Sequence, residues 1–205
     1  MIRLETDFND YYDTECNQNS NIVYVRLQAD KKSRGEELNE LRRFGIKTIQ
    51  FGPLSKFSPL VNKKLVVYTN PMLHNFEGKR IVGFDEAASQ YGNCLMAEFL
   101  DKSGGYTIKY LQVGQRRFNL MFYNPDYMDK LVEGSLVKIE ELPKQYNYAI
   151  GVPIFSIDYI SNGVEMIAVD FNTTQSLISI GLDKVIPASD VAREIRDALV
   201  AYNKV

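Results

Sequence analysis

The sequence predicts an α+β fold. Segments rich in β-branched and aromatic residues dominate the middle of the chain, helical segments lie between and after them, and Asn162–Gly163 marks a tight hairpin between two of the strands. The length of 205 residues suits one compact domain, or one domain made of two small lobes.

Composition excludes several classes of protein. Charged residues make up 24% of the chain and apolar residues 45%, which are ordinary values for a globular domain. The net charge of −2 leaves no basic excess for a phosphate backbone, so we expect no nucleic-acid partner. No apolar run is long enough to span a membrane, and the acidic N-terminus lacks a signal core.

Cysteine and histidine are scarce. Cys16 and Cys94 form neither a disulfide framework nor a zinc site, and this count favours a reducing, cytoplasmic location. His74 is the only histidine, so Ser-His-Asp chemistry would have a single possible base.

Residues 34–44 are predicted to form a helix. Leu38, Leu41 and Phe44 recur every three residues and make one apolar stripe, and Gly45 can adopt the left-handed cap that ends a helix. The other elements expected before residue 100 are a short strand within 22–27, strands at 46–51, 64–68 and 78–83, a helix at 85–91 and an apolar run at 95–100.

The second half of the chain is richer in strands. A final helix is expected from Ser189, which can cap it, with Asp190 at its positive end and an apolar face through Ile195. Before it we expect strands at 106–113, 118–123 and 132–140, a short helix at 143–150, and strands at 154–160 and 165–171.

Three oxygen-bearing side chains stand out near the C-terminal end. Asp170 and Asn172 are two apart on a strand and share a face, and Asp170 interrupts an otherwise apolar run. A carboxylate there is costly unless it is paired or holds a cation. With Asp158 on the preceding strand, the set suits Mg²⁺, which prefers oxygen ligands.

The hairpin register decides whether Asp158 joins this set. A two-residue turn would place Asp158 opposite Ile167, on the wrong side, whereas a three-residue loop would place it opposite Ala168 and diagonal to Asp170. We predict the three-residue loop. The alternative is that Asp158 ends its strand in solvent and that Asp170 opens a loop with local side-chain bonds.

These residues resemble the signature of the ATP-grasp superfamily. In that family an acid on one strand is followed, on the next, by an acid-x-Asn, and together they hold two magnesium ions against ATP; here the residues are Asp158, then Asp170, Phe171 and Asn172. Further segments resemble the family in the same order along the chain: 30–48, 64–81, 95–100 and 110–122.

The resemblance implies a domain plan. It makes residues 1–29 an N-terminal extension and residues 30–205 an ATP-grasp-like domain of two small α+β lobes with mainly antiparallel sheet. The lobes would be 60–97 and 98–205, around a hinge near residue 98. The opening at 5–13 is similar to that of small phage-encoded ATP-grasp-like proteins.

The resemblance also implies an activity. The chain would be an ATP- and Mg²⁺-dependent carboxylate–amine ligase that acts through an acyl phosphate. Its acceptor would be a small molecule or a peptide. Both a partner subunit and a homo-oligomer are compatible with the resemblance. It assigns the phosphate loop to Gly78 and Lys79, the nucleotide hinge to Glu98 and Leu100, and phosphate neutralisation to Arg116 or Arg117. As neighbours on one strand, the two arginines are expected on opposite faces.

The sequence departs from the family pattern at three places. The strand before the phosphate loop ends in Tyr68–Thr69–Asn70 without the usual Lys, Ser156 replaces a frequent Arg, and Asn172 is followed by Thr173 and not by Pro-Gly. These departures favour an alternative, a catalytically degenerate module that binds a nucleotide or a protein. A second alternative is a phage accessory or structural protein without a ligand.

Overall fold

The computed structural model describes most of the chain between residues 32 and 172. The described residues are 2–4, 23–25, 32–73, 78–100, 105–124, 134–146, 148, 150, 154–161, 163–172, 187, 189, 190, 193, 194, 196 and 197. Within these residues no helix combines the length and the apolar character needed to span a membrane.

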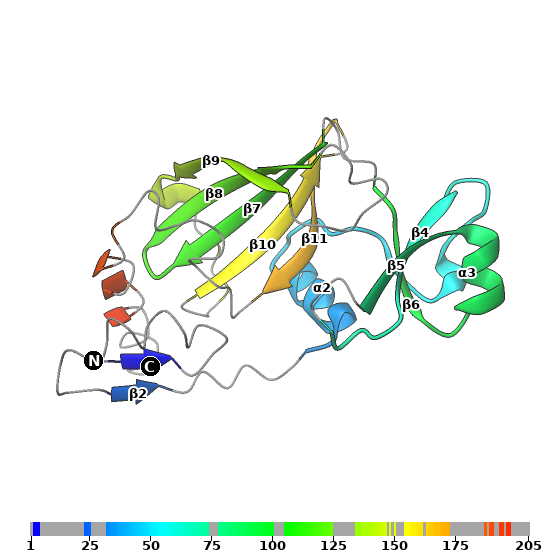
Figure 1. Cartoon of the computed structure of the whole chain (residues 1–205), viewed down its shortest axis with the longest axis horizontal. Helices are drawn as coiled ribbons and strands as arrows, with labels where there is room; N and C mark the ends of the chain where they lie inside the picture. The colour runs from blue at the N-terminus through cyan, green and yellow to red at the C-terminus, as the bar shows by residue number, and fades with distance from the viewer. Residues whose placement is uncertain are drawn as a thin grey trace.

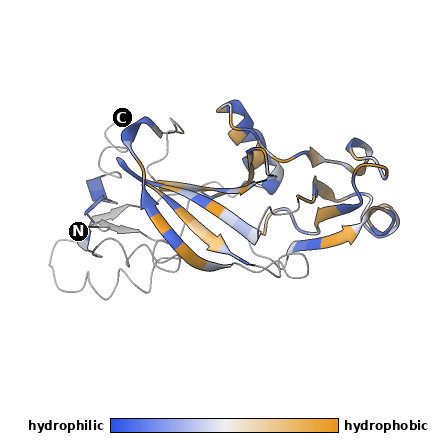
Figure 2. Cartoon of the chain, turned by 90° about the horizontal axis from the view of Figure 1, so that it is seen from above, coloured by the Kyte–Doolittle hydropathy of each residue, from blue (hydrophilic) through white to orange (hydrophobic). Residues whose placement is uncertain are grey.

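The larger sheet of the described chain has five antiparallel strands in the order β11-β10-β7-β8-β9 (Figure 1). Its strands are β7 (Tyr106–Val113), β8 (Arg116–Tyr123), β9 (Ser135–Glu141), β10 (Ile154–Ser161) and β11 (Met166–Asn172). Apolar and polar residues follow one another within single strands of this sheet (Figure 2).

The smaller sheet has four antiparallel strands in the order β3-β6-β4-β5. Its elements are β3 (Phe51–Gly52), β4 (Lys64–Tyr68), β5 (Lys79–Gly83), helix α3 (Phe84–Gln90) and β6 (Leu95–Glu98). The remaining elements are the parallel pair β1 (Ile2–Leu4) and β2 (Val23–Val25), and two 3₁₀ turns, η1 (Leu54–Lys56) and η4 (Lys144–Tyr146).

Helix α2 (Arg34–Arg43) lies beside β11 (Figure 1). Ser33 and Glu36 form a reciprocal capping box at its start. At its end Gly45 has φ +75°, and its N–H donates to Arg42 while the next N–H donates to Leu41, which closes the helix with the predicted glycine cap. Local sequence therefore defines both ends of α2.

The main core joins α2 to both sheets. Leu38 and Leu41 of the helix pack with Tyr68 of the smaller sheet and with Phe155 and Phe171 of the larger one. A second cluster, around Leu65, Val67 and Met96, lies between the smaller sheet and α3. Because one apolar cluster spans both sheets, residues from the two sheets are held at fixed positions relative to each other.

The predicted α+β class with mainly antiparallel sheets is confirmed. Two elements are shorter than predicted. The strand at 46–51 is reduced to Phe51–Gly52 and one parallel bridge from Thr48 to Ala168, because Ile46 and Ile49 are buried three residues apart and the segment does not alternate. The helix at 143–150 is the single turn η4. The final helix lies mostly outside the described residues.

The predicted hairpin register is wrong. Asp158 lies opposite Asp170 and not opposite Ala168, which pairs with Tyr159. Four residues separate the paired ends Ser161 and Met166, and a β-bulge leaves Val169 as an extra residue on β11. The bulge turns Asp170 to the face that carries Asp158, so the two carboxylates are closer than the predicted diagonal.

Candidate functional site

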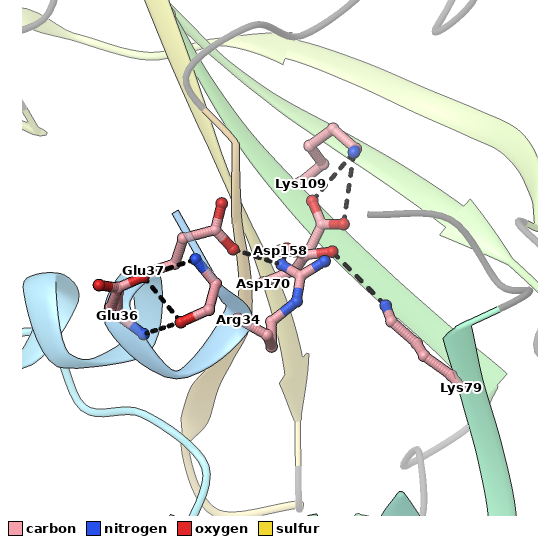
Figure 3. Close-up of polar contacts among 8 residues, drawn as sticks. Arg34, Glu36, Glu37, Lys79, Lys109, Asp158 and Asp170 are labelled. Atoms are coloured by element: carbon pink, nitrogen blue, oxygen red, sulfur yellow. Dashed lines mark hydrogen bonds and ion pairs between the residues drawn. The ribbon is translucent and has the colours of Figure 1, made fainter. Parts of the chain in front are cut away.

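Three charged side chains lie side by side on the larger sheet. Asp158 of β10 is directly opposite Asp170 of β11 on one side and Lys109 of β7 on the other (Figure 3). Directly opposed residues point to the same face of a sheet. Three neighbouring strands therefore present two carboxylates and an ammonium at one position.

Lys109 neutralises Asp158. Its Nζ lies 3.1 Å from Oδ1 and 3.3 Å from Oδ2 of the carboxylate. Lys109 is only 5% exposed. A lysine buried to that degree is costly unless an anion compensates it, so removing either member would leave an unbalanced charge.

Arg34, the first residue of α2, engages two carboxylates. Its Nη1 forms an ion pair with Oδ1 of Asp170 and lies 3.0 Å from Oε2 of Glu37, one helical turn further along (Figure 3). Arg34 is completely buried. Its Nε and Nη2 have no hydrogen-bond partner among the described residues. The guanidinium thus contacts two carboxylates through Nη1, while the N–H groups of Nε and Nη2 make no hydrogen bond to the described residues.

The helix by itself does not favour this position for Arg34. A cation in the first turn is opposed by the helix dipole, which prefers acids there, as at Glu36 and Glu37. The Arg34 N–H donates to the carbonyl of Pro71 at 2.8 Å, which ties the helix start to the loop after β4. The contact with Asp170 offsets the unfavourable dipole.

Lys79 approaches the same carboxylate from the smaller sheet. It begins β5 opposite Tyr68, with Nζ 3.9 Å from Oδ2 of Asp170 and 5.9 Å from the centre of the Tyr68 ring. Burial, reinforced by the positive charge of Arg34, lowers the pKa of Lys79 to about 8. Asp170 therefore has cations from α2 and from β5 around it.

Glu37 completes the cluster. Burial raises its pKa to about 7, although the nearby Arg34 guanidinium opposes that shift. With Arg34, Lys79 and Lys109 charged, three cations face the carboxylates of Glu37, Asp158 and Asp170. Protonation of Glu37 near neutral pH would leave this cluster of three cations and two carboxylates with a net positive charge, which suits a phosphate-bearing ligand.

The chemistry of the predicted metal ligands fits Mg²⁺. Asp158 and Asp170 are adjacent, and Asn172 lies two residues beyond Asp170, opposite Ser156, so all three carry hard oxygens on one face. Among the described residues no three His, Cys, Asp or Glu side chains gather as a metal centre. Both carboxylates already have a cation, so a metal ion would have to share or displace it.

The predicted nucleotide-hinge and loop residues have clear local roles. Glu98 accepts the N–H of Gln50 at 2.9 Å and donates its own N–H to that residue's carbonyl at 3.0 Å. Leu100 packs on the main core. A side chain on Gly78 would meet the Asn70 carbonyl at 2.8 Å, so the loop before β5 requires glycine there. Their roles toward a ligand stay predictions.

Arg116 and Arg117 lie away from the two aspartates. Arg116 forms a bidentate pair with Glu141 of β9, with both contacts at 2.8 Å. Arg117 is buried and donates to the carbonyl of Gln115 at 2.7 Å. The structure brings neither arginine into contact with Asp158 or Asp170, and their predicted catalytic roles stay predictions.

Sequence reasoning did not single out Arg34, Glu37 or Lys109. The signal for Lys109 was a charge inside the strand at 106–113, comparable to Asp170 inside its own apolar run. The signal for Arg34 was a cation at the first position of a helix, where an acid is preferred. Both residues violate a local preference, which is common at functional sites.

Comparisons with known proteins identify the fold. No protein-family model matches the sequence, and no curated protein matches it. Solved structures do match. The ATP-grasp ligase PsnB in complex with a minimal precursor has a TM-score of 0.53, with 11% identity over 83% of this chain and 60% of that chain.

Two further structures match in the same way. The D-alanine–D-alanine ligase from Bacillus anthracis in complex with ATP has a TM-score of 0.58, with 14% identity over 84% of this chain and 67% of that chain. The macrocyclase MdnC from Microcystis aeruginosa, bound to its precursor peptide, has a TM-score of 0.56, with 14% identity over 84% of this chain and 64% of that chain.

The chain therefore has the ATP-grasp fold, as its sequence resemblance implies. It spans 60% of the length of the PsnB chain and 67% of the length of the D-alanine–D-alanine ligase from Bacillus anthracis. At these identities the likeness is one of fold.

Proposed function

We propose that this chain binds ATP between its two sheets and uses it as a carboxylate–amine ligase. The observation that carries the proposal is the convergence of Arg34, Lys79 and Lys109 on the carboxylates of Asp158 and Asp170. Arg34 and Lys109 are buried, and the other three side chains are partly buried. Buried charges are costly for stability alone, and they cluster where a fold binds charged ligands. The ATP complex of a ligase with the same fold supports a nucleotide as that ligand.

Each charged residue has a role in this proposal. Lys79 and Lys109 would neutralise the phosphates of the nucleotide, and Arg34 would offer its free donors to a phosphate oxygen. Asp158, Asp170 and Asn172 would hold Mg²⁺, as their oxygen donors allow. When bound, Mg²⁺ supplies positive charge that offsets the charge developing on the phosphates.

The proposed reaction has two steps. A carboxylate oxygen of the first substrate attacks the γ-phosphorus of ATP, the bond to ADP breaks, and an acyl phosphate forms. The amine of the second substrate then attacks the acyl carbon, phosphate leaves, the amine loses a proton and an amide remains. The chain's cations would stabilise the transferring phosphoryl group by fixed charge, the usual contribution of protein residues to such transfers.

The acceptor is proposed as an amino acid or a peptide. One solved neighbour is a D-alanine–D-alanine ligase, a second is in complex with a minimal precursor, and a third is bound to a precursor peptide. Both classes supply a carboxylate and an amine. We place the activity in the cytoplasm, where a protein with two cysteines keeps its thiols reduced.

A second candidate is a degenerate module that binds nucleotide without turnover. It is favoured by Tyr68, which is buried at the strand end where the ATP-grasp resemblance expects a lysine, and by Ser156 in place of an arginine. Both functions share the nucleotide site, and they differ only in chemistry.

The first test is the unfolding midpoint with ATP and Mg²⁺, with and without EDTA. A ligand that binds only the native state stabilises it, by about 2.7 kcal/mol at a hundredfold excess over the dissociation constant. We expect a rise in the wild type that Asp170→Asn abolishes. Asp85→Asn, which changes an exposed acid on α3, should keep it. No rise at millimolar ATP in the wild type would overturn both candidate functions.

The second test separates ligase from binding module. ADP release is measured with panels of amino acids and of short peptides present together with ATP and Mg²⁺. Acceptor-dependent ADP release that Asp170→Asn abolishes supports the ligase. Nucleotide binding without ADP release across both panels favours the degenerate module.

A further inference from the structure

We propose that Arg34 is a built-in competitor of the divalent cation: its guanidinium occupies Asp170 in the ligand-free chain and must release it before a metal ion binds. This inference rests on the proposed function for the identity of the metal ligands. It goes beyond that function because it assigns a regulatory role to a residue of α2, outside both sheets.

The geometry shows one nitrogen between two carboxylates. Nη1 of Arg34 forms the ion pair with Oδ1 of Asp170 and also lies 3.0 Å from Oε2 of Glu37 (Figure 3). Glu37 can therefore keep Arg34 partly neutralised if Asp170 turns to another cation. The arrangement has a natural second state, with Arg34 on Glu37 and a metal ion on Asp170.

A neutralised carboxylate is a weak metal ligand. Lys109 contacts both oxygens of Asp158, Arg34 holds Asp170, and Lys79 lies 3.9 Å from its other oxygen. A divalent ion entering alone would meet the buried Arg34 and Lys109 and the partly buried Lys79, and would gain only two carboxylates that are already paired. Coulomb repulsion in a poorly solvated site makes that approach unfavourable.

A nucleotide changes this balance. Nε and Nη2 of Arg34 have no hydrogen-bond partner among the described residues, so both nitrogens can donate to a phosphate oxygen. A triphosphate would add negative charge beside all three cations and free the aspartates for the metal. Metal and nucleotide binding would then be coupled, each strengthening the other to the same extent.

The experiment titrates Mn²⁺ alone, without nucleotide, and follows the loss of the free-ion electron paramagnetic resonance signal. It compares the wild type with Arg34→Met, which keeps the side-chain bulk and removes the charge. The matched control is Arg43→Met, an exposed arginine of the same helix. We expect Arg34→Met to bind Mn²⁺ about tenfold more tightly than wild type, and Arg43→Met to match wild type.

Two further variants make the result decisive. Arg34→Met/Asp170→Asn should lose the gain in Mn²⁺ affinity, because the Asp170 carboxylate that Arg34→Met makes available to the metal is absent. Arg34→Met/Glu37→Gln removes the charge of both helix residues and keeps the test possible if Arg34→Met alone does not fold. Equal Mn²⁺ affinity in folded Arg34 variants and wild type would overturn the proposal, as would a gain that persists without Asp170.

These outcomes are independent of the proposed function. ATP binding by the wild type is measured separately, and it can succeed while the Arg34 variants show no gain in Mn²⁺ affinity. A gain in Mn²⁺ affinity without any ATP binding would keep the competition between Arg34 and metal and remove the ligase.

Discussion

Two arginine–carboxylate pairs of this chain differ in surroundings more than in chemistry. Arg116 and Glu141 pair between β8 and β9 through two contacts of 2.8 Å, with side chains 26% and 50% exposed. Arg34 and Asp170 pair between α2 and β11, with side chains 0% and 14% exposed. The first pair has the better fork geometry, and the second is withdrawn from water.

The comparison teaches that the geometry of an ion pair alone does not decide what the pair contributes. An exposed pair contributes little because water and salt screen it. A buried pair is often no better for stability than apolar residues would be, yet breaking it is costly. Arg34 and Lys109 are buried and Lys79 is partly buried around the two aspartates, and the cost of this arrangement is the reason that we propose a ligand for it.

The largest expected effect is at the buried pair. Asp170→Ala should lower the free energy of unfolding by about 3–5 kcal/mol, because it leaves the buried Arg34 with Glu37 as its remaining carboxylate. Urea denaturation would measure it. Asp85→Ala on α3 serves as control and should stay within about 0.5 kcal/mol of wild type. A loss below about 1 kcal/mol for Asp170→Ala would contradict the contrast between the two pairs.

The next largest effect is a pH dependence of the free energy of unfolding that arises from Glu37. Its pKa is raised from 4.5 to about 7 in the folded chain, so the folded state binds this proton more tightly than the unfolded state. The stabilisation is complete below about pH 4.5 and is lost as pH rises through 7. It amounts to ~3 kcal/mol between these limits.

Glu37→Gln tests this dependence because the amide cannot ionise. The difference in unfolding free energy between wild type and variant should shrink or change sign as pH rises from 4.5 to 7, and other groups cancel in the difference. A difference that is flat across this range would show that Glu37 keeps an ordinary pKa in the folded chain.

The smallest effect is at the exposed pair. Arg116→Ala should change the free energy of unfolding by less than about 1 kcal/mol, and the change should fall further in high salt. The measurement is urea denaturation at two salt concentrations. A salt-independent loss of several kcal/mol would mean that exposure does not separate the two pairs.

Much of the fold was predictable because local patterns encode it. The leucine spacing and Gly45 predicted α2 and its end, and the strands 64–68 and 106–113 match β4 and β7. The resemblance at Asp158 and Asp170 implied the ATP-grasp fold that the solved neighbours share. These features depend on residues close together in the chain.

The site was predictable only in part. The charge of Asp170 inside an apolar run made it a candidate, because a buried carboxylate requires a partner wherever the strand lies, and the ATP-grasp resemblance then selected it. The strand register around Asp170 was not predictable from the sequence, because Val169 forms a bulge that depends on how β10 and β11 pair.

The sequence by itself thus determined most helix and strand segments, the fold and the choice of the two carboxylates as candidates. Only the tertiary structure decided which cations reach them. Arg34, Lys79 and Lys109 come from α2, β5 and β7, and they meet because one apolar core holds the helix and both sheets together. Contacts between side chains so distant in sequence arise from packing, which no local pattern encodes.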